Sequence, residues 1–71
     1  MKIIVTTKTN TIIEGKLCNF LSSVVSFDVE QLPAYKAQAI VIEGGELTQY
    51  PNYIHVKMTK DMIQEYVFID E

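Results

Sequence analysis

The sequence of 71 residues lacks arginine and contains a single cysteine, Cys18. One cysteine excludes an internal disulfide and a metal cluster held by several thiolates of one chain. The longest apolar run, at 39–42, has four residues, whereas a membrane-spanning helix needs about 20. Polar residues at 6–11 interrupt the N-terminal apolar stretch before it reaches the length of a signal-peptide core. We therefore expect a cytoplasmic protein that does not associate with membranes.

The missing arginine also bears on nucleic-acid binding. Arginine is the favoured residue for bidentate contacts with phosphate and guanine, and nucleic-acid binders usually carry a basic patch. Here six lysines stand against nine acidic residues, for a net charge of −3, which disfavours a conventional nucleic-acid reader. The same composition fits an AT-rich coding sequence. An acidic, arginine-free protein of this size suggests a phage- or plasmid-type accessory protein that binds and modulates a larger protein.

Glycine and proline are scarce, with three and two residues, while 48% of the residues are apolar and 21% are charged. This composition is typical of a folded globular chain rather than a disordered or collagen-like one. At this length we expect one small domain, residues 1–71, without room for separate catalytic and cofactor domains.

Most of the chain alternates between apolar and polar residues, a period typical of half-buried β-strands. Strands are predicted at 2–7, 12–18, 24–29, 37–43, 46–50, 53–58 and 66–69. Asn10 is expected to take a positive φ in the first turn, and Thr59 to cap one short helical turn at 60–63. Gly15, in the middle of a strand, indicates a bulge, a sharp bend or a close backbone approach. The sequence therefore predicts an all-β fold with at most one short helical turn: a small five- to seven-stranded barrel or a strongly bent sheet.

The pair Gly44-Gly45 predicts a two-residue hairpin between the strands at 37–43 and 46–50. Glu43 and Glu46 would then face each other, and like charges so placed cost up to about 1 kcal/mol. A partner's basic patch, a lysine from elsewhere or a cation would offset the repulsion. Alternatively, both side chains point into water, where screening makes the cost small.

Four tyrosines are candidates for protein contacts, and two of them flank a turn. Tyr50 and Tyr53 enclose Pro51-Asn52, which would hold both rings at one loop. Tyrosine is enriched in interface hot spots because it gives a large contact area at a small entropy cost. The alternative is that these rings simply fill the sheet surface. Their neighbours are mostly uncharged, which favours protein contact over the stacking of nucleic-acid bases.

An apolar-x-Gly-x-Leu-x-x-Phe pattern runs from Ile13 through Gly15 and Leu17 to Phe20, and an alternating strand follows at 24–29. This pattern resembles the first motif of Sm-like proteins and is shared by SH3-like barrels in general. The segment from Val41 to Leu47 is similar to the second Sm-like motif. The resemblance implies a small barrel whose long strands bend sharply to close, and subunits that pair edge to edge in a ring.

The resemblance does not carry over an RNA site. Sm-like rings hold single-stranded RNA with an aspartate and an asparagine after the bent strand, where this chain has Leu21 and then Ser22 or Ser23. The arginine before the glycine of the second motif is replaced by Glu43. An Sm-like oligomeric RNA-binding protein therefore stays the alternative function.

No pattern in the sequence points to catalysis, a cofactor or a metal site. His55 could sense pH or supply one metal ligand, but a lone histidine on a strand is more often a surface residue. We interpret Cys18 as an inert thiol rather than a nucleophile, although the fold could bring it close to His55 in space. The serines lack nucleophile-elbow glycines. We therefore expect a protein that is not an enzyme.

Assembly is the function that the composition favours. A domain of this size buries only about 60% of the surface of its unfolded chain, and small scaffolds usually add disulfides, metals or subunits. The predicted last strand is apolar on both faces and carries Tyr66 and Phe68. It is expected to be an exposed edge. We predict a homo-oligomer or a complex with a protein partner, with Glu43, Glu46, Tyr50, Tyr53, Tyr66 and Phe68 as candidate contact residues.

Overall fold

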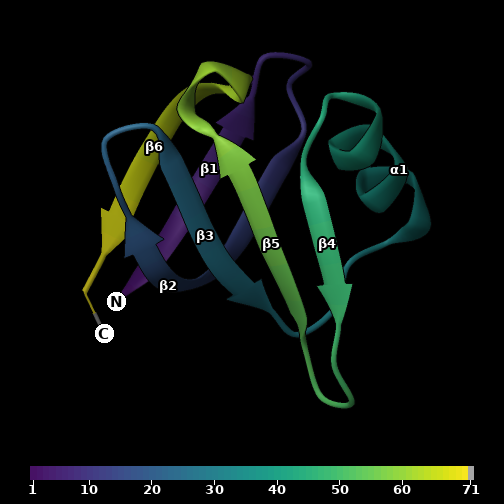
Figure 1. Cartoon of the computed structure of the whole chain (residues 1–71). Helices are drawn as coiled ribbons and strands as arrows, with labels where there is room; N and C mark the ends of the chain where they lie inside the picture. The colour runs from purple at the N-terminus through teal and green to yellow at the C-terminus, as the bar shows by residue number, and fades with distance from the viewer. Residues whose placement is uncertain (71) are drawn as a thin grey trace.

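The computed structural model describes residues 1–70, which form a six-stranded antiparallel sheet and one short α-helix (Figure 1). The elements are β1 (Lys2–Thr7), β2 (Ile12–Phe20), β3 (Val24–Val29), α1 (Ala34–Ile42), β4 (Glu46–Gln49), β5 (Ile54–Thr59), a 3₁₀ turn η1 (Lys60–Met62) and β6 (Ile63–Ile69). The strands are ordered β4-β5-β3-β2-β1-β6 across the sheet. The mostly-β architecture predicted from the alternation is confirmed.

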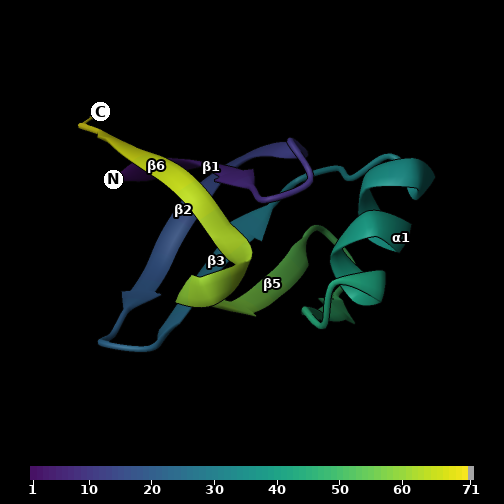
Figure 2. The same ribbon diagram turned by 90° about the horizontal axis from the view of Figure 1, so that it is seen from above.

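The sheet is strongly curved, and one face encloses the hydrophobic core (Figure 2). The buried core residues are Ile3, Val5, Ile13, Val25, Phe27, Val29, Ile40, Val56, Met58 and Met62. Near the end of β2, the Phe20 ring reaches across the curve to Tyr66 and Phe68 of β6, with centroids 4.9 and 5.1 Å away. Among the described residues, β4 and β6 each pair with one strand, so the sheet is open rather than a closed barrel.

Gly15 of β2 packs closely against β3. A Cβ on Gly15 would lie 2.7 Å from the carbonyl oxygen of Asp28 and 2.7 Å from Cδ2 of Phe27. No side chain fits at these distances, so a glycine is required where the curved strands pack together. A bulge, a sharp bend or a close backbone approach was expected at Gly15, and the structure has the close backbone approach.

The irregularity in β2 lies three residues further on, at Cys18. The register between β2 and β3 shifts between Leu17 and Asn19, which makes Cys18 the extra residue of a β-bulge. Because a bulge adds one residue to one strand, Cys18 and Asn19 are both exposed, while Phe20 returns to the side of the core. Cys18 thus lies on the outer face of the sheet in continuation of Glu14 and Lys16, and the bulge changes the facing of the residues that follow it.

The strand predicted at 37–43 is wrong, because these residues lie in and at the end of α1. Pro33 occupies the N-cap position, and the alanines at 34, 37 and 39 are the strongest helix formers. They override the strand tendency of the β-branched run at 40–42. The expectation of at most one short helical turn is wrong for the same reason. No helix among residues 1–70 is long and apolar enough to span a membrane.

The two-residue hairpin predicted at Gly44-Gly45 is also wrong, since the two glycines end the helix. Gly44 has a φ of 105°, which favours glycine. Its N–H donates to the carbonyl of Val41 at 3.1 Å, and the N–H of Gly45 donates to that of Ile40 at 2.8 Å. This pair of bonds is the Schellman arrangement that satisfies the last carbonyls of a helix.

Two turn predictions are confirmed. Asn10 has a φ of 66° in the turn between β1 and β2. The short helical turn predicted at 60–63 is η1, with Thr59 at its N-cap position. The Thr59 hydroxyl forms no hydrogen bond to the backbone of the turn, however, and instead donates to the carboxylate of Asp61.

Candidate functional site

Three side chains with metal-binding or acid–base chemistry meet on the outer face of the sheet: Cys18, Asp28 and His55. They come from β2, β3 and β5, which are neighbours in the sheet. Asp28 lies directly opposite His55 in one ladder and opposite Lys16 in the other. Cys18 follows Lys16 on the outer face of β2, and one ligand atom from each of the three residues lies within 4.8 Å of the others.

Asp28 and His55 form a direct hydrogen bond. His55 Nδ1 lies 2.7 Å from Asp28 Oδ1, and both side chains are partly buried. This bond is the largest cause of a lowered pKa of the Asp28 carboxyl, and it outweighs the effect of partial desolvation. The Cys18 thiol and the positive charge of Lys16 also lower the pKa of Asp28. Asp28 is therefore held as a carboxylate at neutral pH.

The Cys18 thiol is held in its neutral form. Although the residue is exposed, partial desolvation raises the pKa of the thiol, and the nearby Asp28 carboxylate raises it further. Lys16 opposes this shift. Activated cysteine nucleophiles have a lowered pKa, and the Nδ1 of His55 is already bonded to Asp28. The arrangement therefore resembles a ligand set of thiol, carboxylate and imidazole more than a nucleophile with its base.

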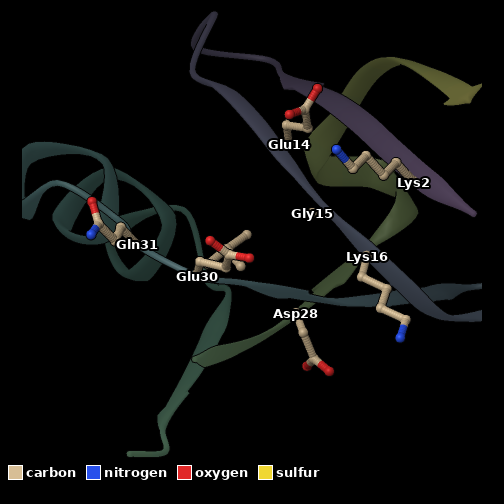
Figure 3. Close-up of a pocket in the computed structure, with 8 residues that line it drawn as sticks. Lys2, Glu14, Gly15, Lys16, Asp28, Glu30 and Gln31 are labelled. Atoms are coloured by element: carbon tan, nitrogen blue, oxygen red, sulfur yellow. The ribbon is translucent and has the colours of Figure 1, made fainter. Parts of the chain in front are cut away.

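A hollow of about 510 Å³ lies beside this cluster, over the bend of β2 (Figure 3). Its lining residues are Lys2, Glu14, Gly15, Lys16, Asp28, Val29, Glu30 and Gln31. Figure 3 shows the side chains of Lys16 and Asp28 pointing to the same side of their strands. Because the lining carries charges of both signs, the hollow has no clear preference for an anion or a cation.

The outer edge of the sheet at β6 is an exposed apolar strip. Tyr66, Val67, Phe68 and Ile69 are all exposed in succession. The rings of Tyr66, Phe68 and Phe20 form a mutual cluster with centroids 4.9–5.4 Å apart. Among residues 1–70, β6 pairs with β1 and with no other strand. The predicted contact residues Tyr66 and Phe68 therefore lie on an open edge with apolar side chains on both faces.

Tyr50 and Tyr53 lie at the opposite end of the sheet, at the turn between β4 and β5. The backbone N–H of Tyr50 donates to the carbonyl of Tyr53 at 2.9 Å, which closes the turn around Pro51-Asn52. The two rings stack with centroids 4.8 Å apart and an interplanar angle of 19°. Both side chains stay exposed, so the turn presents a preformed aromatic surface separate from β6.

The predicted opposition of Glu43 and Glu46 is wrong, because the hairpin that would produce it does not form. Glu43 is the C-cap of α1, and its carboxylate accepts a hydrogen bond from the Thr9 hydroxyl at 2.8 Å. Glu46 begins β4 and lies opposite Lys57 of β5. The repulsion that suggested a basic partner or a cation at this point is therefore absent.

A second apolar surface adjoins α1. The helix buries Ile40 against the core, whereas Ile42 is 84% exposed. A shallow apolar hollow beside it is lined by Ala37, Gln38, Val41, Ile42 and Leu47. The segment 37–43, which was predicted as a strand, thus contributes exposed apolar side chains to a helix that contacts β4.

Comparisons with protein families, curated proteins and solved structures give no match to this chain. Two surfaces of the fold therefore carry its functional interpretation, namely the Cys18–Asp28–His55 cluster and the β6 edge. The sequence predicted the β6 edge and left open that Cys18 and His55 meet in space, which they do, but it did not point to Asp28 between them. Predicting the cluster requires the strand register. Only the register shows that Asp28 lies opposite Lys16 in one strand pair and opposite His55 in the other.

Proposed function

We propose that this protein is a non-catalytic β-domain that works through protein contacts and assembles with a second copy of itself along β6. The observation that carries the proposal is the run of four exposed apolar residues on an unpaired strand. Unpaired strand edges are templates for pairing with another chain, and natural proteins usually protect them with charge, proline or a covering element. The stretch Tyr66–Ile69 has neither charge nor proline, so pairing with a partner strand is its natural protection.

The side chains of β6 suit antiparallel pairing with an identical strand. A two-fold axis through Val67 would place Val67 opposite its own copy and Tyr66 opposite Phe68 of the second chain. Aromatic pairs directly opposite one another stabilise antiparallel strands by about 0.2–1 kcal/mol each. The same register places Glu65 opposite Ile69 and Asp70 opposite Gln64, so no like charges face each other. Two copies would thus join their sheets through one isologous contact.

The size of the domain favours this assembly. A core of ten buried apolar residues serves a chain that has one cysteine and so no internal disulfide. Domains this small leave a large share of their apolar surface exposed and are often stabilised by association. Pairing along β6 would cover Val67 and Ile69 on the outer face and extend the aromatic cluster on the inner face.

We also propose that the curved sheet is an opened variant of the small barrels that the Sm-like and SH3-like pattern implies. The close packing of Gly15 in β2 against β3 supports this relationship. The contact of Phe20 with β6 supports this relationship as well. The ring joins two strands across an opening in the sheet that strand pairing would close in a barrel.

Light scattering after size-exclusion chromatography tests the assembly. The chain has a mass of 8.1 kDa, and we expect twice that mass over a dilution series in the micromolar range. Val67→Lys places two like charges opposite each other at the two-fold axis, so it should yield the monomer. Ile42→Lys is the matched control, because it adds the same charge at an exposed apolar site on α1 and should leave the dimer intact.

Three outcomes would contradict the proposed dimer. They are a monomer at every concentration, a ring of higher mass, and dimers that survive Val67→Lys but dissociate in Ile42→Lys. The last result would move the interface to the apolar surface beside α1.

A further inference from the structure

The structure assigns a binding site for a divalent transition-metal ion of the zinc class to Cys18, Asp28 and His55. A thiolate, an imidazole and a carboxylate are the three ligand types that zinc sites in proteins use. A site with three protein ligands leaves one position of a tetrahedral ion open for water or another ligand. The inference does not depend on assembly along β6, because β2, β3 and β5 lie in the interior of the sheet order.

The distances between the ligand atoms suit such an ion after small side-chain rotations. Zinc bonds of about 2.0–2.3 Å imply that tetrahedral ligand atoms stand about 3.3–3.8 Å apart. The three ligand atoms lie within 4.8 Å of one another, and the pair of Asp28 and His55 is at 2.7 Å. The widest separation must therefore shrink by about 1 Å, and the hydrogen-bonded pair must open by about 0.6 Å.

The backbone around the site holds the three side chains in place. Asp28 and His55 are directly paired residues of two central strands, so the separation of their Cα atoms is fixed by the ladder. Cys18 lies on the same outer face, at the bulge of β2, with its thiol within 4.8 Å of the other two ligand atoms. Bulges are frequent beside functional sites, and the extra residue of this bulge is the third ligand of the set.

The charges around the site are compatible with a divalent cation. A thiolate and a carboxylate would together neutralise the two positive charges of the ion. Lys16 lies opposite Asp28, and Lys57 lies two residues from His55 on the same face of β5. Both lysines would oppose the binding of a cation, but their flexible side chains can extend into solvent.

Metal binding at this site releases protons. The Cys18 thiol must lose its proton to form the metal–sulfur bond, and the ligating imidazole nitrogen must be free of one. Because both ligands bind the ion in their deprotonated forms, the affinity for the metal should increase as the pH rises.

Titration of the reduced full-length chain with Co²⁺, followed by competition with Zn²⁺, tests the site. We expect one metal ion per chain and an absorption band from charge transfer between the thiolate and Co²⁺. Cys18→Ser should abolish this band, and His55→Ala and Asp28→Asn should each weaken binding by at least about tenfold. Glu14→Gln is the matched control, because it removes an exposed carboxylate from the same face of β2 and should leave the affinity unchanged.

The readout does not depend on the proposed assembly or on any activity. Circular dichroism of each variant, recorded without metal, separates loss of a ligand from loss of the fold. The site is refuted if Co²⁺ binds without a thiolate band, if Cys18→Ser retains the affinity, or if no binding occurs at millimolar metal.

Discussion

The carboxylate of Asp28 and the imidazole of His55 are joined by a hydrogen bond of 2.7 Å between two directly paired strand residues. The bond lies on the outer face of the sheet, and it links two strands whose opposite faces carry the core residues Phe27 and Val56. It is also the largest cause of the lowered pKa of Asp28. One polar contact thus sets the charge state at the centre of the cluster, and its removal has measurable consequences.

His55→Ala should raise the pKa of Asp28. A carboxyl whose pKa is lower in the folded than in the unfolded state stabilises the fold at pH values above its unfolded pKa, about 3.9. That stabilisation is lost as the pH falls through the lower, folded value. The free energy of unfolding of the wild type should therefore exceed that of His55→Ala by a margin that narrows as the pH falls from 5 to 2.

NMR titration of the Asp28 side-chain carboxyl carbon measures the shift directly. Glu14→Gln serves as the control, since Glu14 lies on the same face and should leave the Asp28 titration unchanged. An Asp28 pKa that stays the same in His55→Ala would contradict the role of the hydrogen bond.

Cys18 should react slowly with iodoacetamide at neutral pH, because a raised pKa leaves a smaller fraction of thiolate. Asp28→Asn removes the nearby negative charge and should speed alkylation. Lys16→Gln removes the cation that lowers the thiol pKa and should slow it. The pH dependence of the alkylation rate separates these effects from altered access. Equal rates in the two variants would contradict the electrostatic account of the thiol.

The sequence was a good guide to the strands and a poor one to the helix. Alternating polarity locates the strands because side chains on one face of a curved sheet must enter the core. The apolar run at 40–42 has the same composition as a buried strand, and periodicity alone cannot separate the two for so short a segment. The residues that flank this run distinguish the two structures. Pro33 and the alanines between it and residue 40 favour a helix, and Gly44 favours a helix end.

The Cys18–Asp28–His55 cluster could not be predicted from sequence spacing. The three residues are 10 and 27 positions apart and come together only through the order of β2, β3 and β5. A regular β2 would also have left Phe20 on the outer face, and the bulge that prevents this has no glycine or proline to mark it. The aromatic turn of Tyr50 and Tyr53, by contrast, was predictable because Pro51-Asn52 is a local turn signal.

Gly15→Ala should destabilise the fold by about 1–3 kcal/mol. The added Cβ would overlap the backbone of Asp28 and the ring of Phe27, and neither can move without disturbing the core. Gly44→Ala is a useful comparison, since a Cβ there meets nothing within 4 Å and the cost arises from the positive φ alone. Urea denaturation measures the free energy of unfolding of both variants. A larger loss of stability for Gly44→Ala than for Gly15→Ala would contradict the close packing of β2 against β3.

Two isoleucines of α1 test whether the helix is part of the folded core. Ile40 is fully buried and Ile42 is 84% exposed, although they are two residues apart in the same helix. Ile40→Ala should reduce the free energy of unfolding by about 2–5 kcal/mol, because it removes buried methyl groups and leaves a cavity. Ile42→Ala should change it by no more than about 0.5 kcal/mol, since it removes only exposed surface. Urea denaturation curves of the two variants give the comparison, with helix propensity matched because both replace isoleucine by alanine. Equal losses, or a greater loss for Ile42→Ala, would mean that α1 presents a different face to the sheet.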